Sequence, residues 1–298
     1  VQDAVENGYL EVKKDLIFFG RETRPIHKAL ALTTSPYIPG ISGEEDKSLA
    51  FLASIGIKPK LGDKWRALRD LSEEEKKKLC SALADYLISK GFPKEALNLV
   101  GHVYTLVKEE PWTPLRDGRE FSVLLNATGR MDRPSLGIAI CMGDRGAAFE
   151  EANQVLDKYR MLITKYLSWL IDHKRIKELE NIYVIKGEND IEDKIIGTLA
   201  SIVSTSYINK PVIAYATVPS EQIVKISARA LDPLVKRGLD LGKIMRIAAE
   251  KCSGRGGGHN IAAGAQVPIE QVETFIKLVD MLVKEQLGKV EDRSKNSS

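Results

Sequence analysis

Residues Ser253 to Gly264, SGRGGGHNIAAG, join a flexible backbone to an acid–base side chain. Gly256, Gly257 and Gly258 stand between Arg255 and His259. Glycine can adopt positive φ and approach a ligand closely, and the N–H groups of such a loop can form a nest for phosphate or carboxylate oxygens. His259 can donate to a phosphate or stack on a base, and Arg255 is a permanent cation. A purely structural turn that His259 caps is the alternative, and the residues leave both open.

A second basic element precedes the glycines. In QIVKISARAL, residues 222–231, the side chains of Lys225, Ser227 and Arg229 alternate, so a strand would present all three on one face. Such a face could follow a phosphate backbone. An edge strand protected by charge has the same pattern, and the residues do not separate the two interpretations.

A third candidate lies in residues 119–130, REFSVLLNATGR. The run is apolar enough to predict a buried strand, and Asn126 and Arg130 would then lie at its end. Loops at strand ends gather ligand sites in α/β sheets. The following residues 137–144, GIAICMGD, predict another short buried segment.

Several kinds of site are excluded by motif. The glycine run follows a predicted helix and lacks the spacing of a dinucleotide fingerprint, and no GK[ST] ends it as in a P-loop. No clustered D-x-D, D-H-H or H-E-x-x-H arrangement occurs, so no divalent-metal site can be assembled from a motif. By its residues alone the chain is predicted to be a binder.

The pattern of the remaining chain predicts an α/β protein of two lobes. We expect a strand at 10–20 and a largely helical region from 44 to about 107, in which Ser72 caps a helix that Gly91 ends. Residues 147–180 contain no Pro or Gly and predict one long connecting helix. Beyond it we expect strands at 181–187, 210–218 and 222–231, and helices at 191–207, 240–252 and 272–288.

Composition and charge narrow the class of protein. With 298 residues and 43% hydrophobic content, the chain can bury one large core or two ordinary ones. No apolar run approaches eighteen residues and no signal-like N-terminus is present, so we expect a cytoplasmic protein without a membrane partner. Residues 221–264 hold eight Lys/Arg and four Asp/Glu, so the segment has a net charge of +4, which is larger than the net charge of +3 of the whole chain. This concentration indicates either a polyanionic partner or a solvated basic face.

These motifs together resemble a known family. GGGHNIAAG, preceded by VKISARAL, resembles the DHHA1 domain of the DHH phosphoesterase superfamily. LLNATGRMDRPSLGIAICMGD is similar to the NAAGR segment of RecJ-type single-strand exonucleases. VQDAVENGYLEV with FFGRETRP resembles the archaeal RecJ-like branch, the GINS-associated nucleases. The resemblance covers nearly the whole chain and is weakest at about 50–110.

The resemblance implies a domain plan. Residues 1–145 would be the C-terminal part of a DHH domain with a helical insertion at about 44–110, and 146–180 the connector helix. Residues 181–290 would form the DHHA1 domain, with a polar tail at 291–298. Because Val1 lies inside a recognisable segment, we expect a piece of a longer protein, with a natural inactive homologue as the alternative.

The resemblance also implies roles for residues. It implies that Gly256, Gly257, Gly258 and His259 contact substrate phosphates, that Arg229 contacts the strand backbone, and that Asn126 and Arg130 lie near the cleft floor. Family members bind two divalent metals, Mn²⁺ or Mg²⁺, through aspartates and histidines. Those motifs are missing here, and a further acidic ligand would fall just before Val1 or at Asp3, so no metal is expected for this chain alone.

Three functions follow from the resemblance. The first is the nucleic-acid-binding portion of a metal-dependent single-strand exonuclease or phosphodiesterase acting on DNA or RNA. The second is a non-catalytic replisome scaffold that binds GINS and the MCM helicase. The third is a small-nucleotide phosphatase of the same superfamily.

Overall fold

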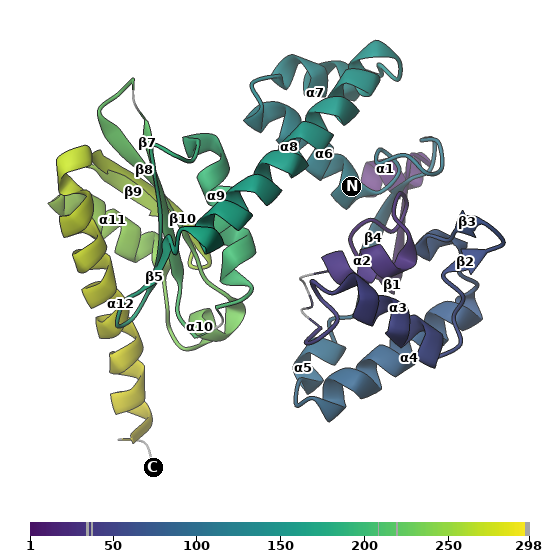
Figure 1. Ribbon diagram of the computed structural model, residues 1–298, viewed down its shortest axis with the longest axis horizontal. Coiled ribbons are helices and arrows are strands. Elements are labelled where there is room, and N and C mark those ends of the chain that lie inside the picture. The colour runs from purple at the N-terminus through teal and green to yellow at the C-terminus, as the bar shows by residue number, and fades with distance from the viewer. Residues whose placement is uncertain (34–35, 37, 208, 219, 296–298) are drawn as a thin grey trace. The chain divides into compact units, whose positions relative to one another are not determined.

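The computed structural model describes residues 1–33, 36, 38–207, 209–218 and 220–295. The chain forms two compact units, Val1–Leu156 and Asp157–Ser298, and both helices and a mixed sheet are present, as the sequence predicts (Figure 1). The long helix α8 (Ala147–Asp172) begins in the first unit and ends in the second.

The first unit combines an antiparallel strand pair with helices. Its elements are α1 (Gln2–Glu6), β1 (Leu10–Leu16), α2 (Ile26–Leu32), α3 (Glu45–Ser54), β2 (Lys60–Leu61), β3 (Lys64–Trp65), η1 (Leu68–Asp70), α4 (Glu73–Ser89), α5 (Pro93–Ala96), β4 (Val100–Leu106), α6 (Gly118–Arg130) and α7 (Pro134–Cys141). Buried apolar side chains from β1, α2, α3 and α4 form one core, which includes Phe18, Leu30, Leu52 and Leu83. This core holds the strand pair and the helices together.

The N-terminus of α4 is as predicted. Ser72 accepts a hydrogen bond from the Glu75 amide, and the Glu75 carboxylate accepts one from the Ser72 amide. This reciprocal arrangement satisfies two donors that a helix start would otherwise leave unpaired. Gly91 follows the last turn with φ +86°, a backbone conformation that suits glycine.

The second unit is a six-stranded sheet with helices on both faces. Its elements after α8 are β5 (Ile176–Glu178), β6 (Tyr183–Glu188), α9 (Asp193–Ser204), β7 (Val212–Val218), β8 (Ile223–Arg229), α10 (Asp232–Lys236), α11 (Leu241–Lys251), β9 (Arg255–Gly258), β10 (Ala262–Pro268), η2 (Ile269–Gln271) and α12 (Val272–Lys295). The strand order is β5-β6-β7-β8-β10-β9. Only β6 and β7 are parallel, and α9 connects them.

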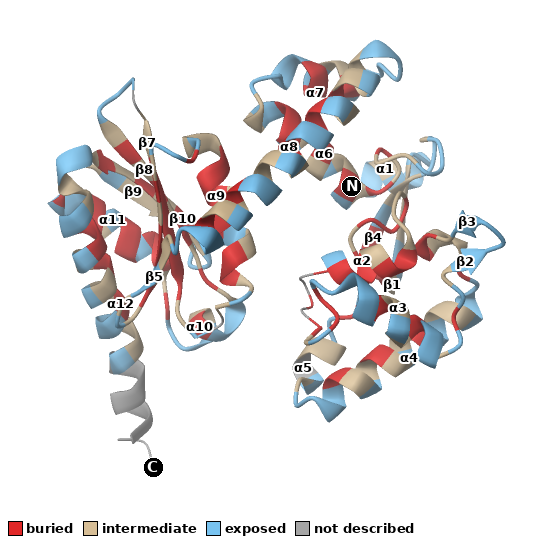
Figure 2. Cartoon of the chain, in the orientation of Figure 1, coloured by how far each residue is buried: buried red, intermediate tan, exposed pale blue. Residues whose placement is uncertain are grey.

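The two faces of this sheet are covered differently. Helices α11 and α12 lie on one face and α9 on the other, which Figure 1 shows clearly. Val224, Ile226 and Ala228 of β8 are buried in the core that includes Met245 of α11 and Phe275 of α12. Figure 2 shows the buried residues running along the sheet and along the helix faces that pack on it. The opposite face of β8, β10 and β9 therefore carries the residues free to form a site.

The predicted strand at 119–130 is wrong, because these residues form helix α6. Asp117 caps its start by accepting hydrogen bonds from the Arg119 and Glu120 amides. The buried positions then recur at helical spacing, at Glu120, Leu124, Ala127 and Thr128. The next predicted buried segment is also helical, since α7 begins at Pro134, whose fixed φ suits the first turn.

Two predicted helical regions contain strands. Residues 100–106 form β4, which pairs with β1 over its full length from Leu10↔Leu106 to Leu16↔Val100. The helix predicted for 147–180 ends at Asp172, and β5 follows, paired with β6. Lys174, with φ +50°, makes the reversal between them. Pairing with β6 overrides the local helix propensity before β5, whereas Val100, Val103, Tyr104 and Thr105 of β4 themselves favour a strand.

The C-terminal helix is longer than predicted. Helix α12 continues to Lys295, so the predicted polar tail at 291–298 begins inside it. Residues 291–295 contain Glu, Asp, Arg and Lys without Pro or Gly, and nothing in them breaks a helix. Residues 296–298 lie outside the described residues.

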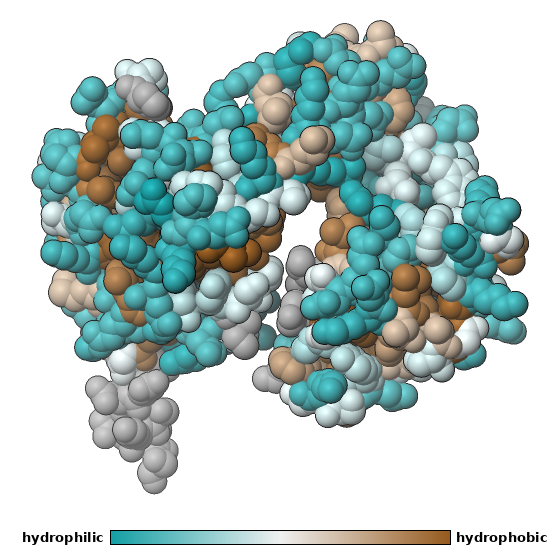
Figure 3. Space-filling view, in the orientation of Figure 1, coloured by the Kyte–Doolittle hydropathy of each residue, from teal (hydrophilic) through white to brown (hydrophobic). Residues whose placement is uncertain are grey.

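The surface of the described residues is largely polar. The face in Figure 3 is mostly hydrophilic, with hydrophobic residues in separate patches. Among the described residues, no helix is long and apolar enough to cross a membrane.

Candidate functional site

The glycine segment forms a hairpin rather than a loop. Residues 255–258 are strand β9, paired with β10 through Gly257↔Gly264 and Gly258↔Ala263. The His259 amide donates to the Ala262 carbonyl oxygen at 2.9 Å, so only Asn260 and Ile261 form the turn. The glycines are thus held in regular antiparallel pairing.

The turn is anchored on both sides. The Leu241 amide, at the start of α11, donates to the Asn260 carbonyl oxygen at 3.1 Å. The Ala230 amide, just after β8, donates to the Ile261 carbonyl oxygen at 2.9 Å. Because both carbonyl oxygens are held, the exposed His259 side chain projects from a fixed backbone.

Two of the three glycines are required by close packing. A Cβ at residue 256 would lie 2.5 Å from the Met245 carbonyl oxygen of α11. Gly258 has φ +141°, and a Cβ there would lie 2.6 Å from the Cα of Ala263. A Cβ at residue 257 would meet no atom within 4 Å. Of the three, Gly257 alone therefore faces open space.

The amides of β9 alternate in direction along the strand. The His259–Ala262 hydrogen bond sets the alternation of the ladder, in which every second residue exchanges hydrogen bonds with its partner. The Gly257 amide is then directed to β10, and the amides of Gly256 and Gly258 point away from β10, to the free edge of the sheet, because β9 is its last strand.

The side chains of β8 alternate as predicted. Val224, Ile226 and Ala228 are buried, whereas Lys225, Ser227 and Arg229 are partly exposed on the other face. Their register partners on β10 are Gln266 opposite Lys225, Gly264 opposite Ser227 and Ala262 opposite Arg229. Strand alternation brings Arg255 and Gly257 of β9 to this same face.

These residues border a shallow open groove. Its volume is about 420 Å³, and its lining is Lys225, Ile226, Ser227, Arg255, Gly256, Gly264, Ala265 and Gln266. The central row, Ser227, Gly264 and Gly257, has almost no side-chain bulk. The groove is therefore open along a floor of small residues, with cations beside it.

The cations beside the groove are held to different degrees. Lys225 Nζ lies 3.0 Å from Asp193 of α9. Arg229 donates through Nε to Ser201 Oγ at 2.9 Å and through Nη1 to the Ala228 carbonyl oxygen at 2.8 Å. Arg255 is exposed and forms no ion pair with the described residues. Together they make a positive rim suited to phosphate or carboxylate oxygens.

The predicted site residues fall in separate units. Arg229, Ser227, Arg255, Gly257 and His259 share one sheet face of the second unit, whereas Gly256 and Gly258 lie on the other face. Asn126 is exposed on α6 of the first unit, and Arg130 is half-buried in the last turn of the same helix. The two are one helical turn apart on α6, not at the end of a strand.

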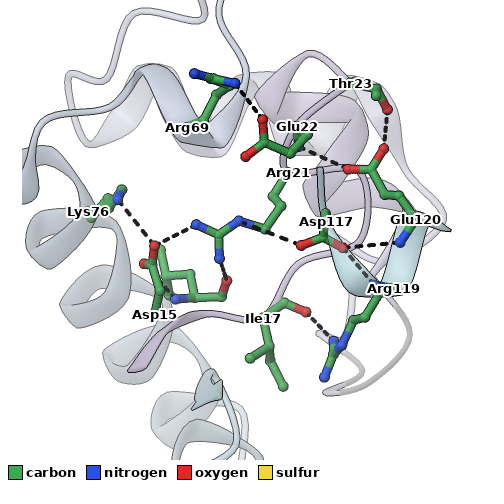
Figure 4. Close-up of polar contacts among 11 residues, drawn as sticks. Asp15, Ile17, Arg21, Glu22, Thr23, Arg69, Lys76, Asp117, Arg119 and Glu120 are labelled. Atoms are coloured by element: carbon green, nitrogen blue, oxygen red, sulfur yellow. Dashed lines mark hydrogen bonds and ion pairs between the residues drawn. The ribbon is translucent and has the colours of Figure 1, made fainter. Parts of the chain in front are cut away.

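A buried polar network in the first unit is the feature that sequence reasoning missed. Figure 4 shows Arg21 between Asp15 and Asp117. Arg21 Nη2 lies 2.6 Å from Asp15 Oδ2, and Arg21 Nε lies 4.0 Å from Asp117 Oδ2. Lys76 Nζ also reaches Asp15, at 3.1 Å. The network connects the end of β1 to the first turn of α4 and to the start of α6.

The neighbouring carboxylates are shifted in opposite directions. Burial by itself raises the pKa of Asp15, but the charge and hydrogen bond of Arg21, the Leu16 amide and the charge of Lys76 outweigh it and lower that pKa. Burial raises the pKa of Glu120, although its carboxylate accepts hydrogen bonds from Thr23 and the Glu22 amide. The signal in the sequence was Asp117 before an N-terminal Glu120, a helix start that we misinterpreted as a strand.

In the described part of the chain, neither unit offers a cluster that fits Mn²⁺ or Mg²⁺. Among the described residues, no group of three or more His, Cys, Asp or Glu side chains could hold a metal ion. The carboxylates in Figure 4 are bound by arginine, lysine and amide donors. Asp3 lies exposed on α1, outside any such group.

Comparisons with known families agree with the motifs. Residues 18–100 match the DHH-CID domain, and residues 180–285 match the DHHA1 domain. The second match contains the whole groove and the hairpin with His259.

Individual relatives extend over most of the chain. The uncharacterized protein MJ0831 of Methanocaldococcus jannaschii is 35% identical over 287 residues, which are 96% of this chain and 58% of that protein. CDC45 from Entamoeba histolytica has a similar fold, with a TM-score of 0.52, 14% identity, and 93% of this chain and 58% of that chain covered. RecJ from Thermus thermophilus in complex with Mn²⁺ aligns with a TM-score of 0.46 and 19% identity, covering 79% of this chain and 32% of that one.

This chain therefore spans little more than half the length of the first two of these relatives. With a DHH-CID domain at residues 18–100 followed by a DHHA1 domain at residues 180–285, the chain carries the domains of the DHH/DHHA1 superfamily that its motifs predicted.

Proposed function

We propose that this chain binds single-stranded nucleic acid through the groove of the second unit, as the nucleic-acid-binding portion of a RecJ-like phosphodiesterase. The observation that carries the proposal is the open floor of Ser227, Gly264 and Gly257 beside Lys225 and Arg255. A floor without side chains lets a strand lie close to the sheet, and the cations meet its phosphates.

The spacing of the cations favours a strand over a single phosphate. Lys225 and Arg255 are separated by two strand spacings, about 10 Å, since both are in register with Gln266. Lys225 and Arg229 are four residues apart on β8, about 13 Å. Cations spread over such distances can meet consecutive phosphates of one strand at the same time.

His259 and Ser227 add hydrogen-bonding capacity to this face. Ser227 lies at the centre of the groove and can donate to a phosphate oxygen. His259 follows β9 and continues its alternation onto the same face as Gly257, where it can donate or stack. Both act without altering the backbone that α11 and β8 hold.

The experiment is oligonucleotide binding in a salt series, followed by fluorescence anisotropy. Arg255→Ala should weaken binding and reduce the slope of log K against log salt by about 0.7, as expected for one lost cation on a single strand. Lys277→Ala is the matched control, because Lys277 is exposed on α12, which packs on the opposite face of the sheet. Equal affinity and slope for all three proteins would contradict the proposal. A dinucleotide that binds as well as a longer strand would favour a small-nucleotide substrate.

Hydrolysis is not assigned to this chain. In this superfamily a pair of Mn²⁺ or Mg²⁺ ions would activate water, and the described residues hold no cluster that fits them. We therefore derive no chemical step, and we place the function of these residues in strand binding.

A replisome scaffold that binds GINS and the MCM helicase is the second candidate. The fold likeness to CDC45 over 93% of this chain supports considering it. Co-purification of this chain with GINS that persists in Arg255→Ala would favour the scaffold. Loss of nucleic-acid binding in Arg255→Ala, without any association between this chain and GINS, would favour the first proposal.

A further inference from the structure

Two tryptophans in the first unit lie half-exposed at one cavity. Trp65, at the end of β3, is 39% exposed, and Trp112 is 42% exposed. Both line a cavity of about 570 Å³ together with Lys58, Lys64 and Arg66. The Trp65 ring contacts the His27 ring, with centroids 4.5 Å apart, and Arg69 lies over the Trp112 ring, but much of both indoles remains exposed at one cavity.

Trp112 is held in an unfavourable backbone conformation. Its φ is +67°, which a bulky side chain rarely adopts. The loop that carries it is clamped, since Arg145 binds the Glu109 carboxylate through Nε and Nη2 at 2.8 and 2.5 Å. Arg116 donates to the carbonyl oxygens of Val107 and Glu109. Backbone strain that the surrounding structure maintains is typical of residues at functional sites.

Cations already lie over both rings. Lys60 Nζ is 4.3 Å from the centroid of the Trp65 ring, and Lys64 Nζ is 4.8 Å from that of Trp112. Neither lysine forms an ion pair with a carboxylate among the described residues, and Lys58 forms none either. Arg66 differs, because Glu75 binds both of its terminal nitrogens. The lining also includes Asp70 and Glu75, so the cavity combines aromatic surface with lysines that form no ion pair with either carboxylate.

We propose that this cavity is a second binding site for single-stranded nucleic acid, in which a base stacks on Trp112 or Trp65 and the adjoining phosphate meets Lys58, Lys60 or Lys64. Stacking on aromatic side chains beside cations is how strands are bound without sequence preference. The flexible lysine stems let the ammonium groups turn from the rings to a phosphate. The class of ligand is that of the proposed function, but the site depends on none of the groove residues.

An acidic peptide is the competing ligand, and the two exposed indole rings favour a nucleotide over it. Carboxylates would engage the three lysines and leave both indoles exposed as before. A nucleotide engages the cations and the rings together. The Trp112 strain has a use only for a ligand with a flat face.

The test uses tryptophan emission of the intact chain during titration with an oligodeoxythymidine. Stacking should quench the emission, and Trp169→Phe should leave that quench in place, because Trp169 is on α8 and outside the cavity lining. The double variant Trp65→Phe, Trp112→Phe should lose it. An unchanged quench in the double variant would overturn the proposal.

An abasic strand of equal length separates stacking from charge. In the Arg255→Ala background, Trp112→Ala should lower oligodeoxythymidine affinity about 10-fold, as expected for one unstacked base, and leave affinity for the abasic strand unchanged. Equal binding of oligodeoxythymidine, abasic strand and polyglutamate would instead assign the cavity to anions in general. The quenching of tryptophan emission reports only on the neighbourhood of the rings. If it were lost in Arg255→Ala but kept in the double variant, the proposed site in the cavity would be refuted, and the proposed site in the groove would be supported. Circular dichroism confirms that each variant is folded.

Discussion

The groove of the second unit and the aromatic cavity of the first unit (the tryptophan cavity) offer opposite chemistry to a nucleic-acid strand. The groove has a floor of Ser227, Gly264 and Gly257 and cations at its border. The tryptophan cavity presents two large rings, Trp65 and Trp112, with lysines over them. In the two proposals above, the first would contact the sugar–phosphate backbone and the second the bases of a bound strand.

The two regions are also supported differently. The groove rests on neutral, close packing of backbone, since β9 touches α11 where side chains are absent. The first unit relies on buried charges, with Arg21 between Asp15 and Asp117. Close packing of backbone is disrupted when a substitution adds a side chain. A buried charge network is disrupted when a substitution removes one of its charges.

The largest expected effect is on the charge network. Arg21→Met should destabilise the first unit by about 3–5 kcal/mol, because Asp15 and Asp117 would lose a buried cation. Urea unfolding followed by tryptophan emission measures it, since Trp65 and Trp112 lie in this unit. Lys13→Met is the control, because Lys13 forms only an exposed pair with Glu11 and should leave stability nearly unchanged. Similar losses for both variants would mean that burial of the network does not matter.

The second effect tests the close packing behind the groove. Gly256→Ala should destabilise the second unit by about 2–3 kcal/mol, because its methyl group would collide with the Met245 carbonyl oxygen. Gly257→Ala should be milder, since its methyl group meets no atom and only the backbone at φ +159° resists it. Thermal unfolding by circular dichroism compares the two. The explanation fails if Gly257→Ala proves the more damaging change.

The third effect is a dependence of stability on acid. Hydrogen bonds from Arg66 lower the pKa of Glu75 to about 2, with the Ser72 amide assisting, from an ordinary value of 4.5. A carboxyl group with a lowered pKa in the folded state stabilises the protein above its ordinary pKa and loses this contribution as the pH falls toward 2. Glu75→Gln should therefore flatten the acid side of the stability curve of the first unit below about pH 4.5.

Glu74→Gln is the matched control for this pH dependence. Glu74 is the exposed neighbour of Glu75 on α4 and forms no ion pair with the described residues. Its variant should keep the acid dependence of the parent. Parallel curves for the parent and Glu75→Gln would contradict the assignment to the Arg66 pair.

The smallest effect distinguishes the two surfaces by salt. Affinity at the groove should fall steeply with salt, and Lys225→Ala should reduce the slope by less than the roughly 0.7 expected of a free cation, because Asp193 already compensates Lys225. Trp112→Ala should change affinity but leave the slope unchanged. Anisotropy titrations at several salt concentrations measure both. A change of slope with Trp112→Ala would show that the rings act mainly by placing the lysines.

Much of the second unit could be predicted because its signals are local. Alternation in QIVKISARAL placed Lys225, Ser227 and Arg229 on one face, which the register of β8 confirms. The helical patterns of 191–207, 240–252 and 272–288 were also found as α9, α11 and α12, with α12 extending further. Each of these patterns depends on residues close together in sequence.

The wrong predictions concern segments whose structure depends on contacts with residues far away in the sequence. β4 pairs with β1 about ninety residues earlier, and the strand-favouring residues Val100, Val103, Tyr104 and Thr105 were given too little weight beside the helical pattern before them. The glycines before His259 were interpreted as a ligand loop, but the approach of Met245 explains Gly256. Asp117 and Glu120 marked a helix start in the sequence, and the apolar run after them was given more weight. Short apolar runs do not distinguish a strand from a buried helix.

The contact between α11 and the hairpin has a consequence for engineering this domain. A Cβ at Gly242 would lie 2.3 Å from the Gly258 carbonyl oxygen, and the Leu241 amide binds the Asn260 carbonyl oxygen. Helix and hairpin are thus interlocked at their backbones. The hairpin alone cannot be transplanted into another scaffold or lengthened by an inserted residue without losing its shape. A transplant would have to carry β8, α11 and the hairpin together, from Ile223 to Pro268.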